Sequence, residues 1–234
     1  MRIADLNWMQ VGEYLKTDDR AVVPLGSTEQ HAYLSLAVDA LIPEKLALDA
    51  AEPLGIPVFP VLPFGVSPYF SAFPGTVSLG VDTYGSLIRD VLDSLSKVGF
   101  RRIVLLNGHG GNGGIASIVA SEWRSLHPGH KVKLYNWWVA PRTQAAIREI
   151  DPIGTHASWM ENFPWTRLEG VTLPTERKPP FDITRKEVLD PDAVRQVIGD
   201  GNYGGLYQRP DEEMMAIWEV AVAEAREAME ERWT

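Results

Sequence analysis

The stretch from residue 101 to residue 137 constrains the fold more than any other part of the sequence. Residues 101–107 (RRIVLLN) are an apolar run typical of a buried strand, and they lead directly into a glycine-rich turn. Asn112 is a candidate N-cap for a helix over residues 115–126, whose apolar side chains recur at helical spacing. Residues 132–137 then supply another strand. A strand, a helix and a strand in this order form a βαβ unit, which predicts parallel strands.

The same signals recur elsewhere in the chain. Strand-like runs lie at 21–25 and 56–62, and helical periodicity lies at 41–51, 82–98, 191–198 and from Met214 onward. Asp82 is a candidate N-cap for the second of these helices. We therefore expect an α/β fold with a mostly parallel central sheet and helices on both faces. No internal repeat or linker-like tract divides the sequence, so we expect a single domain over residues 1–234.

Composition excludes several classes of function. The chain has 31 acidic against 22 basic residues and no cysteine. Without a basic patch we expect no nucleic-acid partner, and without cysteine there is no disulfide, thiolate nucleophile or thiolate-bound metal. The first residues lack an apolar signal core, which favours a cytoplasmic location.

One uncharged stretch could be mistaken for a membrane span. Residues 53–81 carry no charge but contain six prolines, at 53, 57, 60, 63, 68 and 74. That density is incompatible with a continuous helix, so we expect internal loops and no membrane contact. Within this stretch, the aromatic segment 64–76 is suited either to line a pocket or to pack in the core.

Three residues after the first predicted strand could carry chemistry. Side chains alternate in an extended segment, so Glu29 and His31 point to the same side and could bind one ion. A buried, hydrogen-bonded Glu–His pair is the alternative. Asp39 opens the following helix, where a capping role without function is also plausible.

Three more candidates follow later in the chain. His109 lies in the glycine-rich turn, at the strand end where open α/β sheets bind ligands. Such a turn could instead cradle a phosphate, although no Lys-Ser/Thr pair follows it and the dinucleotide-binding pattern is poorly matched. His156 and Glu161 are five residues apart, about 140° apart if the segment is helical, so they need not share one role.

Together these residues favour a metal site. Imidazole and carboxylate ligands without thiolate suit Zn²⁺, Mn²⁺ or Fe²⁺. Two metal ions bridged by one carboxylate would lower the pKa of a shared water and polarise a carbonyl group.

These segments resemble the creatininase-type amidohydrolases. The resemblance rests on four motifs in order: residues 24–31 (PLGSTEQH) with Asp39, 73–76 (FPGT), 107–112 (NGHGGN) and 156–161 (HASWME). It implies a creatininase-like fold with two divalent metal ions at the strand ends, zinc first and manganese or iron as alternatives. It further implies that Glu29 and His109 hold one metal, that His31 holds the other, and that Asp39 bridges them.

The fifth ligand differs from that of creatininase itself. The matching position there is a glutamate and here is Gly111, so the resemblance assigns Glu161 to the second metal, with another acid as the alternative. His156 matches the family histidine that transfers protons during amide cleavage; a core histidine or an extra ligand are the other interpretations. The resemblance also implies a homo-oligomer, a hexamer.

These observations predict a hydrolase that acts on a C–N bond of a small amide or cyclic amide. Residues 32–36 and 70–72 depart from the family pattern, which favours a substrate other than creatinine. A formamide deformylase or a small peptidase using the same site is the nearest alternative. A phosphate- or nucleotide-binding module at residues 107–114, and an oligomer whose metal is only structural, are alternatives from other classes.

Overall fold

The centre of the protein is a parallel three-stranded sheet. We describe a computed structural model over residues 1–184, 188–231 and 233. Its strands β1 (Arg20–Leu25), β2 (Arg102–Asn107) and β3 (Lys131–Asn136) are ordered β1-β2-β3. Leu25 pairs with Asn107 and Asn107 with Asn136, so the three carboxyl ends lie level at one edge. The predicted parallel sheet is confirmed.

The expected strand at 56–62 is reduced to isolated pairings beside β1. Val58 pairs with Val22, and Leu62 pairs with Leu25, both in parallel. Prolines at 57 and 60 lack the N–H that a continuous ladder needs, which explains why only separate bridges form.

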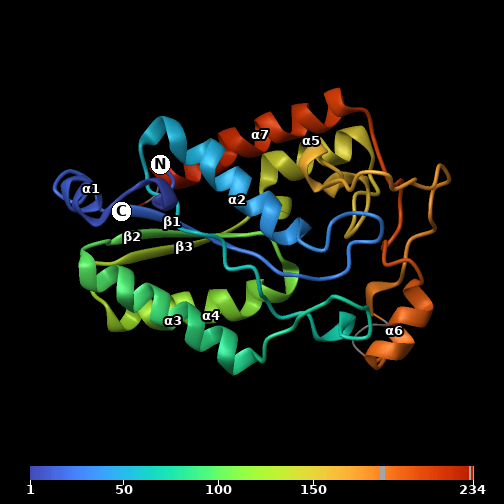
Figure 1. Ribbon diagram of the computed structural model, residues 1–234, viewed down its shortest axis with the longest axis horizontal. Coiled ribbons are helices and arrows are strands. Elements are labelled where there is room, and N and C mark those ends of the chain that lie inside the picture. Colours follow the sequence, from blue (N-terminus) through green and yellow to red (C-terminus); the bar gives the residue numbers. More distant parts are fainter. Residues whose placement is uncertain (185–187, 232, 234) are drawn as a thin grey trace.

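Helices cover both faces of the sheet (Figure 1). One face carries α2 (Val38–Ala51), α5 (Pro141–Ile150) and α7 (Asp211–Glu230), and the other carries α3 (Val81–Val98) and α4 (Gly110–Leu126). The short helices α1 (Trp8–Tyr14) and α6 (Pro191–Ile198) lie at opposite ends of the molecule. Single 3₁₀ turns occur at Ile3–Asp5, Glu52–Leu54, Pro68–Phe70, Trp137–Val139, Trp159–Glu161 and Pro164–Thr166.

Strand β2 separates two apolar cores. Val104 and Leu106 pack on the side of α2 and α7, whereas Ile103 and Leu105 pack on the side of α3 and α4. This division follows from the alternation of side chains along a strand. A strand that is buried on both faces reads as a continuous apolar run, which is why its sequence was recognisable.

Helix ends were predicted less well than helices. The structure begins α3 after Gly80 and α4 after His109, so Asp82 and Asn112 lie inside the first turns and are not N-caps. The Asn112 side chain instead accepts from the N–H of Val66 and donates to the carbonyl of Gly26, which joins α4 to two loops. Helices α1 and α5 were not anticipated, whereas α6 matches its predicted bounds. None of the helices in the described residues is long and apolar enough to cross a membrane.

Candidate metal centre and active site

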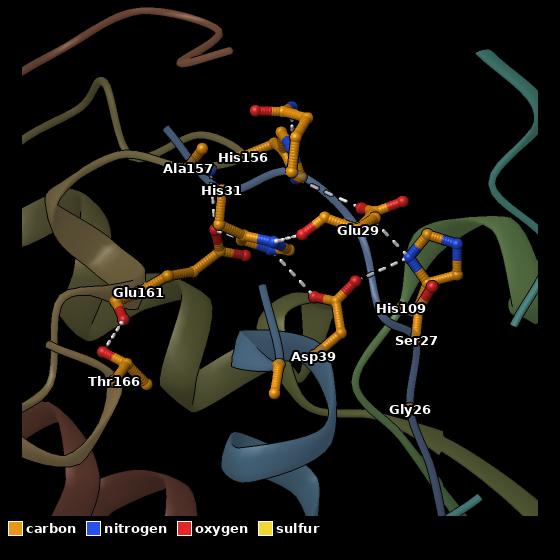
Figure 2. Close-up of polar contacts among 12 residues, drawn as sticks. Gly26, Ser27, Glu29, His31, Asp39, His109, His156, Ala157, Glu161 and Thr166 are labelled. Atoms are coloured by element: carbon orange, nitrogen blue, oxygen red, sulfur yellow. Dashed lines mark hydrogen bonds and ion pairs between the residues drawn. The ribbon is translucent and has the colours of Figure 1, made fainter. Parts of the chain in front are cut away.

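The candidate residues converge at the carboxyl edge of the sheet (Figure 2). Glu29 and His31 follow β1, His109 follows β2, and Asp39 lies in the first turn of α2. Glu161 comes from the long excursion after α5. All five side chains are buried. Five chemistry-bearing residues from separate segments therefore share one interior cluster.

Asp39 lies between two imidazole rings (Figure 2). Its Oδ2 is 2.7 Å from Nδ1 of His109, and its Oδ1 is 3.1 Å from Nε2 of His31. Each carboxylate oxygen therefore faces a different histidine. This is the arrangement expected of a carboxylate that serves two neighbouring cation positions.

The remaining ring nitrogens orient both histidines. Nδ1 of His31 donates to the backbone carbonyl of Glu29 at 3.1 Å. Nε2 of His109 lies 3.0 Å from the carbonyl of Val66 and 3.2 Å from Oγ of Ser67. A hydrogen bond at one ring nitrogen fixes which nitrogen is presented to a metal. His31 therefore presents Nε2, and His109 presents Nδ1, toward Asp39.

Two glutamates flank the histidine–aspartate group. Oε1 of Glu29 is 3.3 Å from Nδ1 of His109, and Oε2 of Glu161 is 3.7 Å from Nε2 of His31. The N–H of Ala157 donates to Oε2 of Glu161 at 2.6 Å and orients it. The segment from His156 to Glu161 is not an α-helix, since only a 3₁₀ turn forms at its end, so the helical angle does not apply.

Burial and mutual charge shift the acid–base properties of the cluster. Burial lowers the pKa of His31, but the facing Asp39 carboxylate outweighs it and raises that pKa to about 10. The pKa of His109 also rises, because Glu29 and Asp39 outweigh burial. Burial raises the pKa of Glu161 to about 7, and it raises the pKa of Glu29 above its usual value. Asp39 is also buried, but the two histidines hold its pKa below the usual value. Without metal, the cluster thus retains protons on both rings.

The donor atoms fit divalent metal ions. Oε2 of Glu29 and Nε2 of His31 are buried and have no hydrogen-bond partner among the described residues. Such unpaired groups are costly unless each of them contacts a cation. Ligand atoms come within 4.8 Å of one another in the groups Glu29–Asp39–His109 and His31–Asp39–Glu161, which share Asp39.

His156 lies at the edge of this cluster. Its ring stacks on Phe70 at 5.0 Å and packs against Tyr203 at 4.8 Å. Nδ1 of His156 is 3.8 Å from Oε1 of Glu29, and Glu29, His31 and His156 also come within ligand distance of one another. Distance alone therefore leaves both a contact with substrate and metal ligation open for this residue.

The cluster forms one wall of a cavity of about 500 Å³. The opposite walls are largely aromatic and apolar, with Tyr69, Phe70, Trp138, Met160, Phe181, Ile183 and Tyr203. None of the described lining residues is a lysine or arginine. The site therefore combines a cluster of candidate metal ligands with walls suited to planar, uncharged groups.

The segments that depart from the family pattern, residues 32–36 and 70–72, contribute to two different cavities. Phe70 lines this cavity, but Tyr33 and Leu34 line a separate one beside Arg167 and Arg209. Of these two segments, residues 70–72 therefore contribute to the cavity beside the candidate metal ligands, through Phe70.

Sequence reasoning missed the contribution of the excursion after α5. Phe181 and Tyr203 reach the cavity from segments that lack periodic patterning. The glycines at 201, 204 and 205 around Tyr203 were the available signal, since a glycine-rich loop can approach a site closely. Gln30 was also passed over, although it lies between Glu29 and His31.

Comparison with known proteins decides the family. A sequence model described as creatinine amidohydrolase matches residues 4–229. The chain belongs to the creatininase family. Its structure superposes on a crystal structure of creatininase with a TM-score of 0.78 at 24% identity, covering 97% of this chain and 95% of the other. The predicted fold class is thus confirmed, and solved creatininases of this fold include a zinc form and a manganese form.

Curated relatives within the creatininase family are more varied. Creatinine amidohydrolase of Pseudomonas putida is 29% identical over 65% of this chain and 63% of its own length. The mycofactocin precursor peptide peptidase of Mycolicibacterium smegmatis is 41% identical over 39% of each chain. The chain thus spans less than two thirds of the relatives it matches. The family includes hydrolases acting on C–N bonds, as these two names show.

Proposed function

We propose that this protein is a metal-dependent hydrolase that cleaves a C–N bond of a small amide or cyclic amide. The observation that carries the proposal is the Asp39 carboxylate, whose two oxygens face His31 and His109 separately. Glu29 and His109 would hold one divalent ion, His31 and Glu161 would hold a second, and Asp39 would contribute to both positions. The thiolate-free donor set suits zinc, with manganese or iron as alternatives.

When bound, such ions would supply a water of lowered pKa and a Lewis acid for the scissile carbonyl group. The chain's own residues orient the ligands and hold the substrate. Hydrogen bonds from the rings to Glu29 and Val66 keep each imidazole turned toward Asp39. His156, on the cavity side of Glu29, is the side chain that contacts the reacting amide.

The cavity favours an uncharged substrate larger than creatinine. Its volume of about 500 Å³ exceeds what a five-membered cyclic amide fills, and its aromatic walls suit a planar or apolar substituent. A small peptidase or formamide deformylase on the same site remains the second candidate. The mycobacterial peptidase, with 41% identity over the shared segment, supports it.

The phosphate-binding alternative is weaker. Glu29 and Asp39 lie at the rim where a phosphate would bind, and both would repel it. A small-molecule substrate, a single domain, a homo-oligomer of hexameric order and a cytoplasmic location stay predictions.

Metal analysis followed by an activity panel tests the proposal. Protein purified without added metal is analysed for bound elements and assayed on amides, lactams, N-formyl compounds and dipeptides. The proposal expects about two divalent ions per chain and hydrolysis that a chelator abolishes and metal restores. Metal-independent activity, or bound metal without hydrolysis of any C–N bond, would contradict it.

A further inference from the structure

The amide side chain of Gln30 is held in one orientation from both ends. Its Oε1 accepts from the backbone N–H of Ala32 at 3.1 Å, and its Nε2 donates to the carbonyl of Gly201 at 3.1 Å. If the amide were rotated by 180°, its NH₂ group would face the N–H of Ala32 and its oxygen would face the carbonyl of Gly201, and both hydrogen bonds would be lost. The positions of its oxygen and nitrogen are therefore determined by their partners.

Unusual backbone conformations maintain both contacts. The two partner residues both have left-handed backbone, with a φ of +50° at Ala32 and +103° at Gly201. A Cβ atom at position 201 would lie 1.6 Å from Oε1 of Gln30, so only glycine allows the loop to pass this close. Left-handed backbone at a non-glycine residue is unfavourable and persists where the surrounding structure holds it in place.

The remaining N–H of the Gln30 amide meets His156. Nε2 of Gln30 lies 2.8 Å from Nε2 of His156. An amide nitrogen can only donate, so the imidazole nitrogen facing it must be the acceptor. A neutral imidazole that accepts at Nε2 carries its proton at Nδ1.

Packing keeps the His156 ring in this orientation. The ring packs against both Phe70 and Tyr203, and the N–H of Tyr203 donates to the His156 carbonyl at 3.1 Å. The ring edge that carries Nδ1 then faces Glu29, and both residues line the cavity. The protonated nitrogen of His156 is thus the one on the reaction side.

We infer that Gln30 is a positioning residue that fixes His156 as the Nδ1–H tautomer, so that His156 presents an N–H donor to the bound amide. The inference narrows the proton-transfer role that the family resemblance implies, because a nitrogen that already carries a proton cannot take one from water and can act only as a donor. It also excludes His156 as a metal ligand, since Nδ1 in this tautomer has no lone pair to offer. The assignment of the His156 tautomer depends only on the hydrogen bonds of Gln30. The statement that His156 donates to a bound amide rests on the proposed function.

Nitrogen NMR of the zinc-loaded protein tests the tautomer without any substrate. Long-range correlations within ¹⁵N-labelled imidazoles identify the protonated nitrogen, and a His156→Ala sample assigns the His156 signals among the five histidines. The expected result is a proton on Nδ1 in the native protein. A proton on Nε2, or a mixture of both forms, would overturn the inference.

Two variants separate positioning from a structural effect. Gln30→Glu replaces the donor with an acceptor and should move the proton to Nε2, while Gln30→Met removes the donor and should leave a mixture. Gln208→Glu makes the same charge change at an exposed position outside the cavity and should leave His156 unchanged. Both Gln30 variants should retain their metal, and each should lose about 10²-fold in kcat on whichever amide is hydrolysed, with a smaller change in KM.

The outcomes distinguish this inference from the proposed function. An unchanged tautomer in both Gln30 variants, or loss of metal from them, would overturn the positioning role even if amide hydrolysis were established. The Nδ1–H tautomer in a protein that hydrolyses no amide would support the positioning of His156 while contradicting the proposed function.

Discussion

A Cβ atom at Gly111 would lie 2.6 Å from Nε2 of His109. The same atom would lie 2.0 Å from the carbonyl oxygen of Val66, which accepts the hydrogen bond that orients the His109 ring. Position 111 therefore has no room for a side chain, and least of all for the glutamate that the family resemblance would place there. This close approach gives a physical reason for the candidate fifth ligand to come from Glu161 instead.

Gly111→Ala should disturb the centre while its neighbour does not. The added methyl group must displace Val66 or the His109 ring, which should cost about 1–3 kcal/mol of stability and lower metal occupancy. Gly110→Ala is the matched control, because a Cβ there meets nothing within 4 Å. Thermal unfolding and metal analysis of the two variants check this, and equal behaviour would contradict the packing argument.

Replacing His156 should lower the rate without loss of metal, whereas replacing Glu161 should remove metal. His156→Ala should keep its metal and lose about 10²-fold or more in kcat, because a donor to the reacting amide is lost. Glu161→Gln should lose metal from one position, because a neutral amide is a weaker ligand. The measurement is metal content alongside rate for each variant; the reverse pattern would mean that the two roles are exchanged.

Metal binding should release protons. The pKa of His31 near 10 and the raised pKa of His109 mean that both rings are protonated in the metal-free protein at neutral pH. Metal needs the bare nitrogens, so binding at about pH 7.5 should expel about two protons per chain, and affinity should rise as pH increases toward 10. Calorimetry in two buffers of different ionisation enthalpy measures this release. Heats that do not depend on the buffer would rule it out.

Creatinine should be a poor substrate. The cavity next to the cluster is large and aromatic, so a small polar ring makes few contacts with its walls. Amides that carry a planar apolar substituent should be hydrolysed with higher kcat/KM than creatinine. Efficient creatinine turnover, with kcat/KM of about 10⁴ M⁻¹s⁻¹ or above, would contradict this prediction.

Much of the fold could be predicted from local patterns. The buried β2 run and the periodic apolar faces of α4 and α7 are signals that a single segment carries. Helix starts were less predictable. Asn112 is a residue type that often caps helices, but here its side chain hydrogen-bonds to Gly26 and Val66, which are distant in sequence. The strand beside β1 was overestimated, since its prolines interrupt the hydrogen-bond ladder.

The residues of the candidate site could be predicted from the sequence, but their orientations could not. Glu29, His31, Asp39 and His109 follow from motifs at strand ends, where topology brings side chains together. The orientation of each ring could not be predicted, because it depends on carbonyl groups of Glu29 and Val66 that only the folded chain places. The role of Gln30 depends likewise on the turn at Gly201, which is distant in sequence.

The central claim is that Asp39 joins two metal positions, and the metal content of Asp39→Asn tests it most directly. The native protein should contain about two divalent ions per chain, and the variant should lose both, because one carboxylate contributes to each position. Asn202→Ala, at a buried polar residue that is absent from the candidate metal groups, controls for general damage and should keep its metal. Full occupancy in folded Asp39→Asn, or loss of a single ion, would contradict the bridging arrangement.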